Sequence, residues 1–349
     1  MIIKKLTKQS MAVGLVGQKV VVYGDNETGK TTVAIEIGKA ICKQVSNNPE
    51  ASPLVLALEN GTNASDDFYL VDGTDYRNVR EVLSDFCNPR NKDYIMENMP
   101  VLIVDGAEKI PTIAKNYVTT KKEIETLGDL DWGKGFDIFK SYTDAPFIKL
   151  MALSGITVIF IFHTEISTDD KTKQSYKFPS GSMKENGICK YIKDNSDFAF
   201  YLEKPVMEDG RKAKSRAYCD DTVEHFGRNR YAEGAETFDI DFSAQSVIDY
   251  VEACGKNLAK KKGVSATTVV EKQQAVTKKM NHDELVAENA RIGKILVGTS
   301  AKDRCLELMR KCAEGTSTGK ITDVDDDNKL ADLLSDLNAL ASDKGIDIG

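Results

Sequence analysis

The fold of this chain is decided by one stretch, Gly24-Asp25-Asn26-Glu27-Thr28-Gly29-Lys30-Thr31-Thr32. It matches G-x-x-x-x-G-K-[ST], the phosphate-binding P-loop. Residues 20–23 before it are a short β-branched run typical of a buried strand, and residues 32–44 after it carry apolar side chains at helical spacing. Strand, glycine-rich loop and helix follow one another in the order that the motif requires. We therefore expect a P-loop here rather than a chance glycine turn.

The positions of this loop have separate roles in holding a nucleotide. Gly24 and Gly29 lack the Cβ that would keep backbone N–H groups away from phosphate oxygens, and the helix that starts near Gly29 adds its positive end. Lys30 would reach the β- and γ-phosphates, and the Thr31 hydroxyl would hold Mg²⁺. The other positions expected to contact ATP are Asn26, Thr28 and Thr32. Two acidic side chains of the loop must point away from the phosphates: Asp25 and Glu27.

Composition sets broad limits on the kind of protein. The chain has 349 residues, 41% of them hydrophobic and 29% charged, which suits one large domain with an appendage or two domains. Its seven cysteines are scattered and its histidines number three, so no zinc framework can be drawn and free thiols are expected. No apolar window has the length of a membrane span. We predict a cytoplasmic protein without a membrane partner, located in a host bacterial cell if it is phage-encoded.

The net charge of −7 counts against a protein coated in positive charge for duplex DNA. Local basic loops, or a ring with a basic lining, are compatible with it.

Apolar runs and helical periods alternate along the first two thirds of the chain. Residues 54–58, 68–71, 101–104, 156–162 and 198–202 are predicted strands, and residues 76–86 and 139–153 are predicted helices. This alternation predicts an α/β fold with a mostly parallel sheet covered on both faces. Ligands of such sheets bind where strands end at their carboxyl edge. Four polar signals stand at such ends: Gly24, Glu59, Asp105 and His163.

The rest of the chain predicts an antiparallel extension and a helical tail. Residues 213–219 and 222–226 flank Asp220-Asp221, which indicates a hairpin, and residues 247–254 read as a closing helix. A lysine-rich stretch then reads as a linker. Helical spacing returns at 285–297 and 304–312, and leucines line one face of residues 330–340. The predicted domains are an ATPase domain at 1–255, a linker at 256–280 and a helical C-terminal tail at 281–349.

Three strand-end side chains supply the chemistry of hydrolysis. Asp105 closes an apolar strand, the Walker-B arrangement that places a carboxylate near Mg²⁺. The base for the attacking water is Glu59 or Glu108, with Glu59 favoured because it ends the strand after the P-loop unit. His163 suits a polar sensor of the γ-phosphate, and the alternative is a histidine that only satisfies the core.

The order of these motifs resembles the RecA-like ATPases, and more narrowly the phage-type ATP-binding proteins related to recombinases and single-strand annealing ATPases. The resemblance covers roughly residues 1–254. It implies that Glu59 is the catalytic glutamate and that His163 senses the γ-phosphate. It also implies that Arg228 and Arg230 could reach into a neighbouring subunit's ATP site in a homo-oligomer, the alternative being two exposed loop arginines. Gly106 departs from the pattern, because a hydroxyl residue is commoner after the Walker-B aspartate.

In RecA-like proteins, DNA lies on the loops after the Walker-B and sensor strands, here residues 115–140 and 165–190. These ranges hold lysines beside aromatic residues, a combination that suits single-stranded DNA. An ordinary solvated loop is the alternative. The lysines and aromatics are Lys121, Lys122 and Trp132 in the first range, and Lys171, Lys173, Tyr176, Lys177, Phe178 and Lys184 in the second.

Our first hypothesis is a Mg²⁺-dependent ATPase that acts on single-stranded DNA in recombination, annealing or replication. A hexameric helicase or helicase-loading motor is a second hypothesis. A third is a nucleotide-gated assembly protein with little turnover, whose leucine-faced tail recruits a protein partner.

Overall fold

The structure is a computed structural model of the chain. It describes residues 11–59, 66–130, 133–183, 187–207, 210–211, 213–264, 266–268, 282–316, 318–326, 329–330, 333–334, 336–337, 340–341, 344 and 346. The chain divides into two compact units, Met1–Lys272 and Gln273–Gly349, and each is described by itself.

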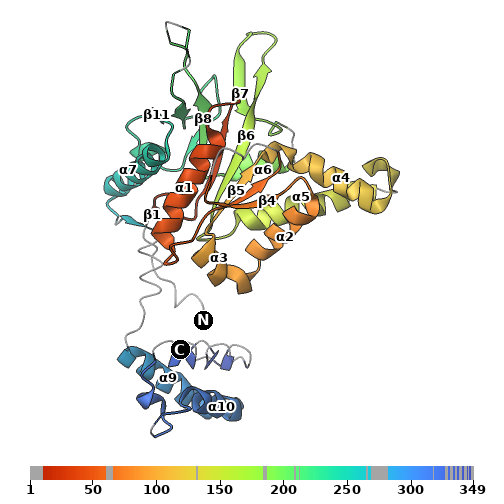
Figure 1. Cartoon of the computed structure of the whole chain (residues 1–349). Helices are drawn as coiled ribbons and strands as arrows, with labels where there is room; N and C mark the ends of the chain where they lie inside the picture. The colour runs from red at the N-terminus through yellow and green to blue at the C-terminus, as the bar shows by residue number, and fades with distance from the viewer. Residues whose placement is uncertain are drawn as a thin grey trace. The chain divides into compact units, whose positions relative to one another are not determined.

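The first unit is built on a ten-stranded sheet (Figure 1). Its strands are β2 (Lys19–Gly24), β3 (Leu54–Ala57), β4 (Tyr69–Asp72), β5 (Val101–Asp105), β6 (Thr157–Thr168), β7 (Ser175–Pro179), β8 (Phe198–Glu203), β9 (Arg216–Tyr218), β10 (Arg228–Asn229) and β11 (Asp239–Asp241). The order across the sheet is β11-β9-β8-β2-β6-β5-β3-β4, with β10 on β8 and β7 on β6. Every neighbouring pair from β8 to β4 is parallel, whereas β9 and β11 extend the sheet antiparallel. This confirms the predicted α/β class with a mostly parallel sheet and an antiparallel extension.

Helices cover both faces of this sheet. Successive residues of a strand point to opposite sides, so each central strand contributes side chains to both cores. Val20 and Val22 of β2 pack with α1 (Lys30–Val45) and α7 (Ala244–Lys262). Val21 and Tyr23 pack in the opposite core. That core is covered by α2 (Tyr76–Phe86), α3 (Lys92–Asn98), α4 (Ile110–Lys122), α5 (Lys134–Met151) and α6 (Ile188–Asn195). The central strands are therefore buried on both sides, which explains their continuous apolar runs.

The predicted hairpin at 213–226 is only half correct. β9 forms, but it pairs with β8 and β11, and residues 222–226 make no strand. The hydroxyl oxygen of Thr222 accepts the backbone N–H groups of Glu224 and His225, each at 3.1 Å. A side chain that takes local backbone donors in this way favours a turn over a ladder.

Helix α7 runs across the domain boundary predicted at 255. α7 continues to Lys262, and Leu258 and Ala259 are buried within it. Its three final lysines lie in the last turn, where cations interact favourably with the helix dipole. Beyond it, β12 (Ala266–Thr268) pairs in parallel with β1 (Met11–Val13). The first part of the predicted linker thus belongs to the ATPase unit, and residues 269–281 lie outside the described residues.

The two ranges predicted as DNA-binding loops are more ordered than expected. In the first range, α4 continues to Lys122 and α5 begins at Lys134, while Trp132 lies outside the described residues. In the second, β6 runs past His163 and pairs with β7, forming an arm that projects beyond the body of the sheet (Figure 1). Lys184 lies outside the described residues. We call residues 164–179 the β6–β7 arm.

The second unit has a helical core of its own. It contains α9 (His282–Val297), α10 (Lys302–Cys312) and further helical residues between 329 and 341. Leu330, Leu333 and Leu337 are buried in one cluster with Ile292 and Leu296. The leucine face predicted to recruit a partner is therefore used inside the unit, because its side chains complete this small core.

In the part of the chain that the structure describes, no helix combines the length and the apolar character needed to cross a membrane.

Candidate functional site

The P-loop connects β2 to α1 and curls around the Lys30 ammonium group. Lys30 Nζ donates to the carbonyl oxygens of Gly24 and Asp25, each at 2.8 Å. Gly29 has φ +83°, a left-handed conformation that glycine adopts without strain. A Cβ on Gly24 would lie 2.7 Å from the Leu202 carbonyl oxygen of the neighbouring strand. Both glycines are thus required by the backbone path of the loop.

The remaining loop positions divide between framework and surface. Thr28 is buried, and its hydroxyl donates to the Asp25 carbonyl at 2.8 Å. Ser215 supports the loop from β8–β9, because its hydroxyl donates to the Thr28 carbonyl at 2.7 Å. The exposed positions are Asp25, Asn26, Glu27 and Thr32.

Thr31 and Asp105 form a hydroxyl–carboxylate pair at the carboxyl edge of the sheet. Thr31 Oγ1 donates to Asp105 Oδ2 at 3.0 Å. Asp105 is 2% exposed, and this burial raises the pKa of its carboxyl group above the usual value, against the lowering effects of Thr31 and of the Lys30 charge. For the Lys30 ammonium, burial acts in the opposite direction and lowers the pKa, and the nearby carboxylates oppose that shift. A Mg²⁺ ion fits such oxygen donors. The glycine cradle, the Lys30 ammonium and this pair together fit a Mg²⁺–nucleotide.

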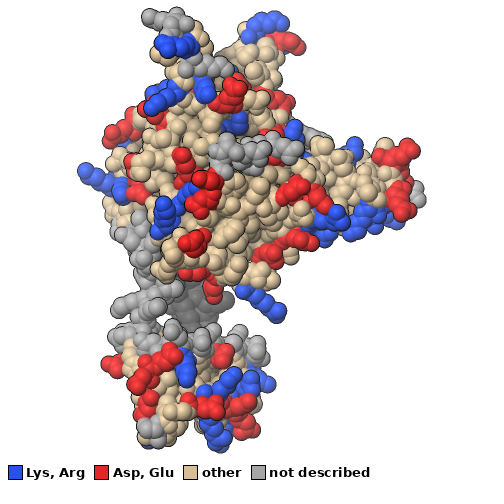
Figure 2. Space-filling view, viewed as in Figure 1, with Lys and Arg blue, Asp and Glu red and all other residues tan. Residues whose placement is uncertain are grey.

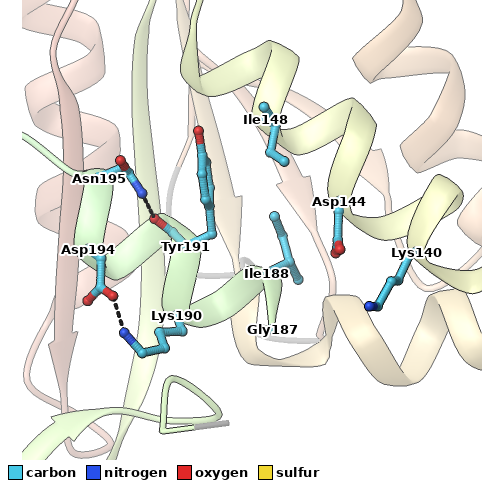
Figure 3. A pocket seen from close by; sticks show the side chains of 9 residues that line it. All are labelled: Lys140, Asp144, Ile148, Gly187, Ile188, Lys190, Tyr191, Asp194 and Asn195. Carbon is cyan, nitrogen blue, oxygen red and sulfur yellow. Dashed lines mark hydrogen bonds and ion pairs between the residues drawn. The ribbon is translucent and has the colours of Figure 1, made fainter. Parts of the chain in front are cut away.

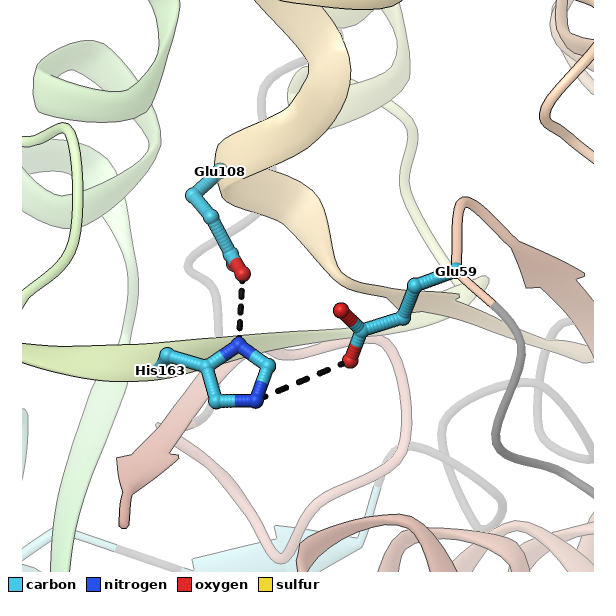
Figure 4. A group of neighbouring side chains, drawn as sticks. All are labelled: Glu59, Glu108 and His163. Carbon is cyan, nitrogen blue, oxygen red and sulfur yellow. Dashed lines mark hydrogen bonds and ion pairs between the residues drawn. The ribbon is translucent and has the colours of Figure 1, made fainter. Parts of the chain in front are cut away.

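Three more ionisable side chains meet beside this pair (Figure 4). His163 of β6 lies between two carboxylates: its Nδ1 is 2.6 Å from Glu108 Oε1, and its Nε2 is 3.8 Å from Glu59 Oε1. Glu59 follows β3, and Glu108 lies in the 3₁₀ turn Ala107–Lys109 after β5. The side chain of Glu108 is 8% exposed, against 30% for Glu59. The Glu108 carboxylate is therefore buried against the His163 imidazole, whereas the Glu59 carboxylate is accessible to solvent.

Gly106 makes this close approach possible. It has φ +77°, and a Cβ added to it would lie 3.0 Å from Cγ of Glu59. In the sequence, the missing hydroxyl after Asp105 is a departure from the family pattern that the chain resembles. The structure gives it a physical reason, since glycine leaves the space that the Glu59 side chain occupies.

An open cleft lies between the P-loop and the middle of β6. It has a volume of about 410 Å³ and is lined by Asp25, Asn26, Glu27, His163 and Thr164. The parallel register places the predicted strand-end residues along one edge of the sheet, since Gly24 is level with His163 and Asp105 with Ala57, two residues before Glu59. A reacting phosphate held by the P-loop would face His163 and the side chains next to it.

Comparison with known proteins identifies the family of this fold and site. Residues 16–231, more than half of the chain, match the family model described as AAA domain. The chain belongs to the AAA domain family. It therefore carries a P-loop ATPase domain, and the coarse part of the sequence prediction is confirmed.

Two further comparisons add little to this AAA domain assignment. No match to a curated protein was found. Among solved structures, the chain is similar to the flagellar accessory protein FlaH from Methanocaldococcus jannaschii, with 12% identity and a TM-score of 0.30 over 66% of this chain and 86% of that one. With so low a TM-score, this likeness carries no weight for fold or function.

The AAA domain does not bring Arg228 and Arg230 to its own nucleotide site. β10 pairs with the first residues of β8, so both arginines lie at the amino edge of the sheet, opposite the P-loop. Arg228 donates to the Asp194 carbonyl, and Arg230 forms an ion pair with Asp197. A catalytic role within the same chain is thereby ruled out for both, and a role in a neighbour's site stays a prediction.

A larger cleft, of about 650 Å³, lies between α5 and α6 of the AAA domain (Figure 3). Several of its polar side chains are already engaged: Lys190 pairs with Asp194, and Asn195 Nδ2 donates to the Tyr191 carbonyl at 2.8 Å. None of the site residues above lines it. We therefore place the functional site at the smaller cleft, which the P-loop and His163 line and beside which Glu59 and Glu108 meet His163.

Proposed function

We propose that this AAA domain hydrolyses ATP with Mg²⁺ at the carboxyl edge of its sheet. Lys30 holds the β- and γ-phosphates, and Thr31 and Asp105 hold the metal ion. Mg²⁺, when bound, neutralises the negative charge of the phosphate oxygens. The observation that carries the proposal is the meeting of Lys30, the Thr31–Asp105 pair and Glu59 along one edge.

Glu59 accepts the proton of the attacking water in this proposal. Its carboxylate is accessible and lies beside Asp105 and His163, whereas the Glu108 carboxylate is buried and hydrogen-bonded to His163. A general base must reach the water that it deprotonates. Glu108 instead orients the imidazole of His163, so that Nε2 faces the cleft and can contact the γ-phosphate.

We further propose that hydrolysis is coupled to single-stranded DNA in phage-type recombination, annealing or replication. The β6–β7 arm supports this, because one strand carries His163 at the site and then leaves the body of the sheet. The residue directly after the arm's returning strand is also tied to the site, since Ser180 N donates to the His163 carbonyl at 2.9 Å. A change at His163 on nucleotide binding is thereby passed directly to the arm.

The arm contacts DNA through charge rather than through base stacking in this proposal. Phe178 is 1% exposed, Tyr176 bonds to Asp221, and Lys177 bonds to Tyr201, so these side chains are already engaged. The exposed lysines lie at the turn of the arm: Lys171 and Lys173. Figure 2 shows basic and acidic side chains together at the end of the arm, which predicts modest rather than tight binding.

ATP turnover with and without single-stranded DNA, measured over a range of salt concentrations, tests this function. We expect DNA to stimulate turnover in the unaltered chain. The double variant Lys171→Ala/Lys173→Ala should bind DNA more weakly. The slope of log affinity against log salt should also fall by about 1.4, or about 0.7 for each phosphate that a lysine no longer neutralises.

A matched control removes two exposed lysines from α1 and α3, in the variant Lys43→Ala/Lys92→Ala. It changes net charge equally and should leave DNA binding and its salt dependence as they are. Equal losses in both double variants would mean that the arm has no special part. Turnover that never responds to DNA would leave an ATPase without the proposed coupling.

A nucleotide-gated assembly protein is the second candidate, and the separate C-terminal unit favours it. A unit with its own core can recruit a partner without disturbing the ATPase sheet. Because its leucines are buried, a partner would bind another face of the unit. Tight ATP binding with negligible turnover, even with DNA present, would support this candidate over the first.

A further inference from the structure

Glu59, Glu108 and His163 form a compact set of metal-binding side chains. One carboxylate oxygen from each glutamate and one ring nitrogen of the histidine lie within 4.8 Å of one another. Figure 4 shows the three side chains converging from β6, from the turn after β5 and from the end of β3. Because they come from three separate elements of the sheet edge, their convergence is held by the fold rather than by one mobile loop.

Glu108 supplies a second and independent sign of a ligand. Its side chain is more than nine-tenths buried, at 8% exposed, and its carboxyl group faces His163. Oε1 contacts the imidazole, but the buried Oε2 has no hydrogen-bond partner among the described residues. An unpaired carboxylate oxygen is costly in a buried place, and a bound cation would remove that cost.

We propose that these three side chains bind a divalent ion of the zinc class. One imidazole with two carboxylates is a donor set that suits Zn²⁺ and its transition-metal neighbours, while Mg²⁺ prefers oxygen ligands alone. The site shares no ligand with the Thr31–Asp105 pair, so it is distinct from the Mg²⁺ position. Water or a phosphate oxygen in the cleft would complete the coordination.

Occupation of this site inhibits ATP hydrolysis, and this consequence rests on the proposed function. A Glu59 carboxylate that coordinates a metal ion can no longer accept the proton of the attacking water. Lys30 and the P-loop are not ligands, so nucleotide binding continues. The ion therefore acts as an inhibitor that lowers turnover without displacing ATP.

The binding itself is tested without nucleotide. The full chain, prepared without a histidine tag, is titrated with Co²⁺ and with Zn²⁺ by absorption spectroscopy and calorimetry. We expect one ion per chain. Glu59→Gln and Glu108→Gln should each weaken binding by tenfold or more, since loss even of a supporting group costs 10- to 100-fold. Glu36→Gln, an exposed acid of α1, is the matched control and should bind as the unaltered chain does.

The seven cysteines of the chain make a thiolate site the main rival. Co²⁺ bound to thiolate gives an intense charge-transfer band in the near ultraviolet, and Co²⁺ bound to nitrogen and oxygen does not. Absence of this band, together with the loss in both glutamine variants, supports the proposal. A strong band, or affinity unchanged in both variants, overturns it. Circular dichroism of the variants establishes that each remains folded.

Turnover is measured separately at saturating Mg²⁺–ATP with added Zn²⁺. Inhibition that a zinc-selective chelator reverses, without loss of bound nucleotide, supports the inhibitory role. Metal binding in a chain that shows no turnover at all would support the site and refute the proposed function. Turnover that Zn²⁺ does not alter, although the site is filled, would overturn the inhibitory role.

Discussion

Gly106 separates the Walker-B strand from the turn that carries Glu108, and it decides where Glu59 lies. Its left-handed conformation and its contact with Glu59 are two different constraints on the same residue. A second glycine, Gly133, has nearly the same conformation at φ +74°, but an added Cβ there would meet nothing within 4 Å. Substitutions at Gly106 and at Gly133 therefore separate the effect of backbone strain from the effect of displacing the Glu59 side chain.

Gly106→Ala should lower both stability and turnover, whereas Gly133→Ala should lower stability alone. Each alanine costs about 1–2 kcal/mol for a left-handed backbone, measured by urea denaturation. Only at Gly106 does the new methyl group push Glu59 away from the cleft, and a small misplacement of this kind can cost about 100-fold in rate. Equal turnover in the two folded variants would contradict the role given to Gly106 and Glu59.

At the scale of elements, charged side chains hold the amino edge of the sheet together through hydrogen bonds and an ion pair. Asp197, just before β8, accepts the Lys19 backbone N–H at 2.8 Å and pairs with Arg230. Lys19 is 4% exposed, and its ammonium donates to the carbonyl oxygens of Leu153 and Ile156 at 2.9 and 2.7 Å. Burial lowers the pKa of Lys19 to about 8, and the Asp197 charge acts against that shift. Arg230 is thus one member of a structural network.

Arg230→Ala should reduce the free energy of unfolding by about 1–2 kcal/mol, because Asp197, 8% exposed, loses a charged partner. Lys19 stays beside Asp197 and limits the loss. Arg228→Ala should change stability by less than about 0.5 kcal/mol, since its guanidinium is at the surface and its bond among the described residues is to a backbone carbonyl. Urea denaturation of the two variants measures both effects.

The same variants test the role of these arginines in a neighbouring subunit. A finger that reaches a transferred phosphoryl group is worth about 10³–10⁵ in rate. A loss of that size in folded Arg230→Ala would assign the residue to a neighbour's site. Unchanged stability would contradict the structural role.

Elements with a continuous apolar pattern could be predicted from the sequence, and elements fixed by distant contacts could not. β5 and β8 are apolar throughout and end at polar residues, so their place and the edge that they form follow from local pattern. The sequence predicts a loop where the β6–β7 arm lies. The strands of the arm are ordered by contacts with residues far away in the chain, and these leave no local pattern. Tyr176, for example, bonds to Asp221, a contact that no local period contains.

The candidate site shows the same division between pattern and distant contact. Strand-end polarity indicated Glu59, Asp105 and His163, because parallel strands bring their carboxyl ends together. From the sequence, Glu108 is only an alternative general base, since the sequence alone does not show that its side chain turns back to His163. Arg230 was assigned by family resemblance, and its pairing with Asp197 depends on the register of β10 against β8.

For the whole molecule, the proposed site and the second core lie in different compact units. Every residue of the proposed site and the whole ten-stranded sheet belong to Met1–Lys272. The unit Gln273–Gly349 buries a leucine-rich cluster that includes Leu330 and Leu337. Two separate cores predict two separate folding units.

A chain ending at Lys272 should fold and bind ATP as the full chain does. We expect affinity within about twofold, because no residue beyond Lys272 takes part in the proposed site, and a change of that size corresponds to only about 0.4 kcal/mol. The separate fragment 273–349 should show helical circular dichroism and a cooperative unfolding transition of about 3–5 kcal/mol, the usual range for a core of this size.

Sizing chromatography of the full and shortened chains then shows what the second unit adds. A smaller assembly in the shortened chain, with ATP affinity retained, would place subunit or partner contacts in the second unit. A tenfold loss of ATP affinity would instead mean that the two units do not act separately.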